Sequence, residues 1–310
     1  MWLSCAINYF MTGITMASTF ANGIELEYDT FGATADRPLL LIMGLGAQMT
    51  RWPVSLCELL AAQGHYVIRF DNRDVGLSHK CDDAGAPDMA EIFAQAMAGE
   101  TVTAAYNLSD MASDAAGLLD ALNISAVHVC GASMGGMIAQ VMALEHGSRV
   151  KSLTSIMSTT GNPDLPSSTP EASTALMSPA GQTLDEVMTR AVTVAKVINS
   201  PGYLIEDADI MQRARQDYER CFYPVGVSRH MAAIAATGNR KPRLESLNMP
   251  TLVLHGEDDN LVPLTGGIDT HEAIKDSVLK TFKGMGHNLP EPLWADFSEA
   301  IAAHTKKHND

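Results

Sequence analysis

A serine flanked by glycines is the feature of this sequence best suited to do chemistry. Ser133 lies in the run Gly131-Ala132-Ser133-Met134-Gly135, between an apolar stretch at 126–130 and a helix-like stretch at 136–144. A tight strand-to-helix turn can expose the serine hydroxyl when its neighbours are small, as glycines are. The following helix would direct its free N–H groups toward the reacting atoms. The pattern predicts that Ser133 is a catalytic nucleophile, whereas a merely structural turn would need no acid and histidine downstream.

A serine nucleophile needs a base, and His287 is the best placed of the ten histidines. It lies in the glycine-containing loop 283–288, after an apolar strand at 277–282 and before a helix that starts near Pro290. A loop histidine next to glycine can turn its ring toward a cleft, which a histidine on a helix face cannot do freely. His255, at the end of an apolar strand, is interpreted as a packed or hydrogen-bonded strand-end residue.

The acid of such a site is expected between the serine and the histidine, in a loop at the carboxyl end of a strand. Glu257, Asp258 and Asp259 follow the strand at 251–254. We favour Asp259, because the Asn-Leu-Val-Pro that follows turns the chain into the next helix. Asp258 is the first alternative and Asp164 a more distant one. The acid would hold the imidazole in one tautomer and stabilise the imidazolium.

Hydrolysis at a carbonyl also needs donors for the oxyanion. An apolar strand at 37–43 runs into Gly44-Leu45-Gly46-Ala47, where small residues let backbone N–H groups approach a substrate. We predict that the backbone N–H groups of Leu45 and Met134 form the oxyanion hole. Taken alone, the segment is equally compatible with an ordinary glycine-rich loop.

The rest of the chain alternates between strand and helix patterns. The apolar segments predict strands at 24–29, 37–43, 66–70, 126–130, 150–156, 251–254 and 277–282. Strands separated by helices indicate a mainly parallel sheet covered on both faces. The alternation stops between about 160 and 243, where helical patterns occur at 184–198, 206–221 and 227–236. We expect this segment to form a helical cap that walls the pocket above Ser133.

Several segments resemble the α/β-hydrolase superfamily, and within it the bacterial carboxylesterases of the aclacinomycin methylesterase type. The resemblance is carried by residues 40–44, 69–78, 131–136 and 284–287. It implies an α/β-hydrolase fold with a mainly parallel sheet of about eight strands, flanked by helices, and a cap inserted after the sixth strand. Many relatives have a histidine before the oxyanion glycine, whereas this chain has Met43.

The expected activity is that of a carboxylesterase: a Ser-His-Asp triad cleaves a small-molecule ester through an acyl-enzyme, with no cofactor and no metal. The same triad also suits a cofactor-free perhydrolase, a lactonase or a carbon–carbon bond hydrolase. A binding protein that retained the fold without turnover is a further alternative, from a different functional class. Fold alone does not decide among these activities.

The composition restricts the size of the fold, the classes of binding partner and the cellular compartment that can be expected. The 310 residues are 46% hydrophobic and 18% charged, enough for one α/β core domain with a cap. A net charge of −15 argues against nucleic acid or an anionic membrane as a partner, because both select for basic surfaces. Five widely spaced cysteines, an odd number, favour reduced thiols in the cytoplasm.

The domain boundaries follow from these patterns. We expect residues 22–159 and 244–310 to form the core domain, residues 160–243 the cap, and residues 1–21 an extension outside the core. The first ten residues are apolar and uncharged but lack the basic region of a secretion signal, so a secreted protein is the weaker alternative. No apolar stretch in the sequence is long enough to span a bilayer.

Overall fold

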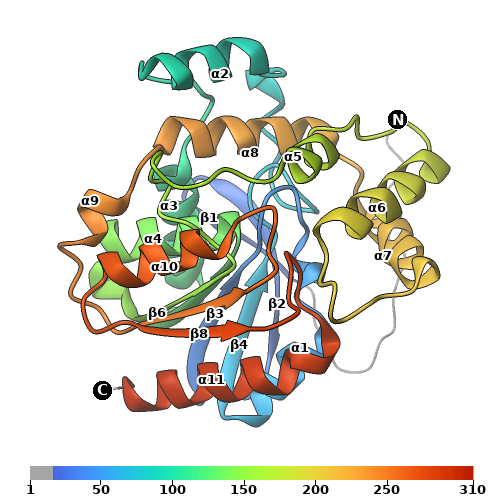
Figure 1. Ribbon diagram of the computed structural model, residues 1–310. Helices are drawn as coiled ribbons and strands as arrows, with labels where there is room; N and C mark the ends of the chain where they lie inside the picture. The colour runs from blue at the N-terminus through green and yellow to red at the C-terminus, as the bar shows by residue number, and fades with distance from the viewer. Residues whose placement is uncertain (1–16, 310) are drawn as a thin grey trace.

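The computed structural model describes residues 17–309, and its centre is an eight-stranded sheet (Figure 1). The strands are β1 (Ala17–Ala21), β2 (Ile24–Phe31), β3 (Arg37–Ile42), β4 (His65–Phe70), β5 (Val127–Ala132), β6 (Val150–Ile156), β7 (Thr251–Gly256) and β8 (Val278–Phe282). Their order in the sheet is β1-β2-β4-β3-β5-β6-β7-β8. Of the seven strand pairs within residues 17–309, β1–β2 and β2–β4 are antiparallel and the other five are parallel. The predicted mainly parallel α/β sheet is confirmed.

The N-terminal edge of the sheet corrects one predicted boundary. Residues 17–21 pair antiparallel with β2, so they belong to the sheet and not to an extension reaching residue 21. Asn22 and Gly23 form the two-residue turn, with φ values of 50° and 80°. An Asn-Gly pair is a strong hairpin signal, and it was missed because the strand before it is too short to show an alternating pattern. Residues 1–16, which make up the rest of the predicted extension, lie outside the described residues.

Apolar side chains of the central strands point alternately to the two faces of the sheet. On β3, Leu40 and Ile42 face one hydrophobic core while Leu39 and Leu41 face the other, and all four are fully buried. The first core is covered by α3 (Leu108–Ala121), α4 (Met134–Glu145) and α10 (Leu264–Ala273); the second is covered by α1 (Val54–Ala62) and α11 (Trp294–Lys307). In Figure 1, α1 and α11 lie together below the sheet.

Helices replace the alternating pattern between β6 and β7, as expected from the sequence. They are α5 (Pro170–Leu176), α6 (Leu184–Ile198), α7 (Asp207–Arg220), α8 (Pro224–Thr237) and the short α9 (Lys241–Leu244). Thr169 caps α5, and Thr183 with Glu186 forms a capping box on α6. We refer to α5–α8 as the insertion helices; α8 crosses above the sheet (Figure 1).

The remaining elements are short or peripheral. A helix that the sequence patterns did not predict, α2 (Met89–Ala98), packs against α8. In the described part of the chain, single turns of 3₁₀ helix occur at Met49–Arg51, Asp82–Ala84, Gly147–Arg149 and Glu291–Leu293. Within residues 17–309 no helix has both the length and the apolar character needed to cross a bilayer.

The parallel strands bring the predicted site segments to one edge of the sheet. The carboxyl end of β3 leads to Gly44, that of β5 to Ser133, that of β7 to Asp259 and that of β8 to His287. Neighbouring parallel strands end on the same side, so segments far apart in the chain meet there.

Candidate active site

Ser133 occupies a strained turn between β5 and α4. Its backbone has φ 56° and ψ −122°, a region that costs a non-glycine residue about 1–3 kcal/mol. A Cβ on Gly131 would lie 2.0 Å from the carbonyl oxygen of Gly135, and a Cβ on Gly135 would lie 2.0 Å from that of Ile42. Both glycines are therefore required sterically, which is the local reason why the chain can turn so sharply at Ser133.

A continuous line of hydrogen bonds joins Ser133, His287 and Asp259. The Nε2 atom of His287 lies 2.9 Å from the Ser133 Oγ, and its Nδ1 lies 2.7 Å from the Asp259 Oδ2. An ionised carboxylate only accepts, so Nδ1 carries the proton and Nε2 accepts from the serine hydroxyl. The His287 side chain is 8% exposed and that of Asp259 fully buried. The arrangement leaves Nε2 unprotonated and facing the hydroxyl, as a general base must be.

The Asp259 carboxylate is fixed by the loop that carries it. Its Oδ1 atom accepts hydrogen bonds from the backbone N–H groups of Leu261 (3.0 Å) and Val262 (2.8 Å), which leaves Oδ2 for the imidazole. The two alternative acids are not brought to His287. Asp258 accepts instead from the backbone N–H of Gly284, and Asp164 is exposed on the surface.

His255 forms a hydrogen bond to the same loop. Its ring is fully buried, its Nε2 lies 2.8 Å from the carbonyl oxygen of Val262, and the same atom is 3.7 Å from the Asp259 Oδ2. Burial lowers the pKa of this imidazole, so the ring stays neutral and donates from Nε2 to the carbonyl. This geometry agrees with the interpretation of His255 as a hydrogen-bonded strand-end residue.

The loop after β3 passes directly beside the nucleophile. A Cβ on Gly44 would lie 3.1 Å from the Cβ of Ser133. The N–H of Ala47 donates to the carbonyl of Gly44 and closes a turn around Leu45. Among residues 17–309, no protein acceptor is hydrogen-bonded to the N–H of Leu45 or of Met134. Both predicted oxyanion donors are therefore available to a ligand.

Buried ion pairs join the loop after β4 to the insertion helices. The Asp71 Oδ2 lies 2.7 Å from an Arg220 nitrogen of α7, and the Asp74 Oδ1 lies 2.7 Å from an Arg229 nitrogen of α8. Both carboxylates are fully buried. A buried charge needs its partner, so these pairs hold the insertion against the core.

The insertion also contacts the loops of the histidine and the acid. The carbonyl of Ile198 accepts from the backbone N–H of His287 (2.7 Å), and the Ser200 Oγ accepts from that of Gly286 (2.9 Å). The Asn260 side chain donates to the carbonyl of Val197 (2.6 Å). The sequence analysis pointed to none of these contacts, because nothing local in the insertion marks a residue as a partner of a distant loop.

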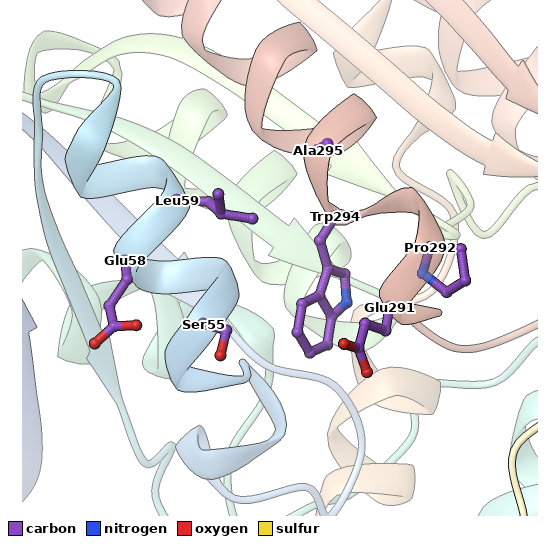
Figure 2. A pocket seen from close by; sticks show the side chains of 7 residues that line it. All are labelled: Ser55, Glu58, Leu59, Glu291, Pro292, Trp294 and Ala295. Atoms are coloured by element: carbon purple, nitrogen blue, oxygen red, sulfur yellow. The ribbon is translucent and has the colours of Figure 1, made fainter.

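Other features of the described chain lie apart from this site. No group of three or more His, Cys, Asp or Glu residues within residues 17–309 is arranged to hold a metal ion. A groove of about 480 Å³ lies between α1 and the start of α11, and Ser133, Asp259 and His287 are not among the residues that line it. Figure 2 shows its lining residues, with the ring of Trp294 between the two helices: Ser55, Glu58, Leu59, Glu291, Pro292, Trp294 and Ala295.

Comparison with known proteins places this chain in a family. Residues 37–291 match the family described as the alpha/beta hydrolase fold, and the chain belongs to it. It is 28% identical over 305 residues to rhodomycin D methylesterase from Streptomyces peucetius, covering 91% of this chain and 95% of that protein. The resemblance to methylesterases of this type, expected from the sequence, is thereby confirmed.

Other relatives have different activities. The chain is 24% identical over 294 residues to 3-oxoadipate enol-lactonase 2 from Acinetobacter baylyi, covering 93% of this chain and 96% of the lactonase. A solved meta-cleavage product hydrolase from Pseudomonas fluorescens superposes with a TM-score of 0.72 at 19% identity, covering 94% of this chain and 97% of that one. That structural likeness supports the fold alone. The family membership and the methylesterase relatives together identify a hydrolase.

Proposed function

We propose that this protein hydrolyses carboxylic esters of small molecules by a Ser133–His287–Asp259 triad. The observation that carries the proposal is the unbroken hydrogen-bonded line from the Ser133 hydroxyl through the imidazole to a buried carboxylate. The similarity to a methylesterase over nearly the whole chain supports an ester as the substrate class.

In the proposed acylation, His287 Nε2 takes the proton of the Ser133 hydroxyl as the Oγ attacks the ester carbonyl carbon. The carbonyl oxygen becomes an oxyanion and accepts hydrogen bonds from the N–H groups of Leu45 and Met134. When the tetrahedral intermediate collapses, the bond to the alcohol oxygen breaks and the imidazolium gives its proton to that oxygen. An alcohol leaves, and the acyl group stays on Ser133.

Deacylation repeats the sequence with water as the nucleophile. His287 takes a proton from the water, the resulting hydroxide attacks the acyl carbonyl, and the same two N–H groups stabilise the second oxyanion. The proton returns to the Ser133 Oγ as its bond to the acyl carbon breaks, which releases a carboxylic acid. Throughout, Asp259 keeps Nδ1 protonated and stabilises the imidazolium.

We further propose that residues 160–243 act as a cap over this site. The insertion helices are bonded to the loops after β4, β7 and β8, and α8 lies against residues 44–47, which carry the proposed donor Leu45 and which we call the oxyanion loop. A cap in this place would exclude bulk water and wall the acyl pocket.

The decisive experiment compares the wild-type protein with Ser133→Ala on a nitrophenyl acetate-to-octanoate series. We expect saturable turnover by the wild type and a fall in kcat of at least about 10⁴ in the variant. A fluorophosphonate should label the wild type but not the variant. Ser298→Ala, a buried serine on α11 away from the site, is the matched control and should keep full activity. Ester turnover surviving in Ser133→Ala would refute the proposed nucleophile.

A second set of assays on the wild-type protein tests the substrate class. An aryl methyl ester, a lactone and a meta-cleavage-type diketone are offered to the wild type alongside the nitrophenyl series, and a halide-oxidation assay with peroxide and acetate tests for peracid formation. We expect the highest kcat/KM on an open-chain ester. The lactone is a specific second candidate because of the enol-lactonase relative, and a higher kcat/KM on it would reassign the substrate class while leaving the triad in place.

A further inference from the structure

The oxyanion loop receives one of its hydrogen bonds from the insertion. The N–H of Gly46, the residue after the proposed donor Leu45, lies 3.2 Å from the Nδ1 atom of His230 on α8. The other ring nitrogen of His230, Nε2, lies 2.7 Å from the carbonyl oxygen of Arg73 in the loop after β4. One imidazole therefore bridges the loops that follow two neighbouring strands, β3 and β4.

These partners determine the protonation state of His230. A backbone N–H can only donate, so Nδ1 must be unprotonated, and a carbonyl oxygen can only accept, so Nε2 must carry the proton. The ring is fully buried, and burial lowers the pKa of the imidazole, which keeps it neutral. The rings of Tyr106 and His230 pack in an edge-to-face arrangement, with centroids 6.4 Å apart and an interplanar angle of 77°. The imidazole has one orientation that satisfies both bonds.

Packing of α8 fixes the place from which His230 reaches the loop. A Cβ on Gly226 would lie 2.0 Å from the carbonyl oxygen of Asp74, and a Cβ on Gly46 would lie 2.6 Å from a methyl group of Val227. Gly46 has φ 62°, which only glycine adopts readily. The first turn of α8 thus packs closely on both loops, through Gly226 against Asp74 and through Val227 against Gly46, one turn before the histidine.

The bond to His230 matters because of what it does to the adjacent peptide. The N–H groups of Gly46 and Ala47 are both occupied, the first by His230 and the second by the carbonyl of Gly44. The N–H of Leu45, which precedes them, has no hydrogen-bond acceptor within residues 17–309. An oxyanion hole works because its donors are held in place before the charge develops.

We propose that His230 is a positioning residue, which holds the oxyanion loop from the insertion so that the Leu45 N–H stays directed at the reacting carbonyl oxygen. The proposal rests on the proposed function of Leu45 and Ser133. It makes the insertion part of the catalytic geometry and not merely a wall of the pocket. Nothing near His230 in the sequence marks it for this role.

Two substitutions of His230 each remove one of its two hydrogen bonds and keep the other. In His230→Asn the amide oxygen takes the place of Nδ1, at the same number of bonds from Cβ, and can accept from Gly46. In His230→Gln the amide nitrogen takes the place of Nε2 and can donate to the Arg73 carbonyl, but nothing accepts from Gly46. Each variant loses one buried hydrogen bond, so their thermal stabilities should fall by similar amounts.

The activities should differ although the stabilities do not. We expect His230→Asn to keep kcat within about 3-fold of the wild type, and His230→Gln to lose about 10- to 100-fold in kcat with KM changed less than about 2-fold. Inhibition by a boronic acid, whose tetrahedral Ser133 adduct places an oxygen in the hole, should weaken in the Gln variant alone. A residue that only packs the core would give no such separation of kcat from KM.

The rate of labelling by a fluorophosphonate provides a readout that does not depend on the substrate. The Ser133 Oγ forms a bond to phosphorus, fluoride leaves, and His287 takes the serine proton. The phosphonyl oxygen, which becomes negatively charged in the transition state, occupies the same hole. If the wild type is labelled but turns over no ester, the proposed function fails, while the order of labelling rates still tests His230. Equal rates in the Asn and Gln variants, or a faster Gln variant, would overturn the proposal. Loss of cooperative thermal unfolding in both variants would overturn it too, because His230 would then act on stability.

Discussion

Replacing Asp259 with asparagine should trap His287 in the wrong tautomer. The Oδ1 atom of Asp259 accepts two backbone N–H groups, from Leu261 and Val262. An asparagine must keep its oxygen at those donors, which puts its NH₂ group where Oδ2 now meets the His287 Nδ1. That group donates, so Nδ1 gives up its proton and Nε2 becomes protonated. A protonated Nε2 cannot accept from the Ser133 hydroxyl.

The expected loss is about 10⁴ in kcat, which corresponds to about 5.4 kcal/mol of transition-state stabilisation. The packing is nearly unchanged by Asp259→Asn, so the melting temperature should stay within a few degrees of the wild type. The assay is steady-state hydrolysis of nitrophenyl acetate at neutral pH, with circular dichroism melting on the same samples.

Asp258→Asn is the matched control, because this neighbouring carboxylate is exposed and accepts only from the Gly284 N–H. It should keep kcat within about 3-fold. If Asp259→Asn retained more than a tenth of the wild-type kcat, or if Asp258→Asn were the more damaging change, the assignment of the acid would be wrong.

Two predictions concern stability. Gly135→Ala would place a Cβ 2.0 Å from the Ile42 carbonyl oxygen and should lower the free energy of unfolding by about 3 kcal/mol or prevent folding. Gly147→Ala, whose Cβ meets open space, is the control and should change the free energy of unfolding little. Equal urea midpoints for the two variants would contradict this prediction. Burial lowers the pKa of His128 to about 4. The imidazole therefore binds a proton below about pH 6.5 in the unfolded chain but only below about pH 4 in the folded protein. Between pH 7 and pH 5 this difference should lower the free energy of unfolding by about 1–2 kcal/mol. His128→Asn should flatten this dependence, measured as urea midpoints at both pH values, and an unchanged slope would refute it.

The sequence predicted the fold well where the information is local. Buried parallel strands such as 37–42 are continuous apolar runs, and the alternation of such runs with helices specifies an α/β sheet without any knowledge of distant contacts. The turn at Ser133 was visible for the same reason, because its glycines are adjacent in the chain and are required by clashes with backbone atoms nearby in the fold. Edge strand β1 was missed because five residues pairing with one neighbour carry too little pattern.

The order of elements also allowed the residues of the proposed triad to be selected from the sequence. Once Ser133 is placed at the end of one parallel strand, any residue at the end of a later neighbouring strand falls at the same edge of the sheet. Asp259 and His287 satisfy that condition through β7 and β8. The choice between Asp258 and Asp259 was less secure, since neighbouring residues in a loop point in different directions that only the backbone of the loop determines.

Contacts between the insertion and the core could not be anticipated in this way. Arg220, Arg229 and His230 meet their partners because helices α7 and α8 dock at particular positions, and helix docking depends on side-chain shapes summed over the whole interface. A helix-face histidine has no local signature that distinguishes a bridge between loops from an ordinary packed residue.

The docking of the insertion links stability and catalysis. Two buried carboxylates, Asp71 and Asp74, have their charges compensated by arginines of the insertion, so lifting α7 and α8 away from the core would expose or unpair both. The same movement would break the bond from Gly46 to His230. Opening of the insertion for substrate entry must therefore either leave α8 in place or disassemble the oxyanion loop. Since α8 packs on the core at Gly226 and Gly46 without room for a side chain, and α6 is bonded through Val197 and Ile198 to the loops of Asp259 and His287, an opening that preserves the site leaves both helices in place.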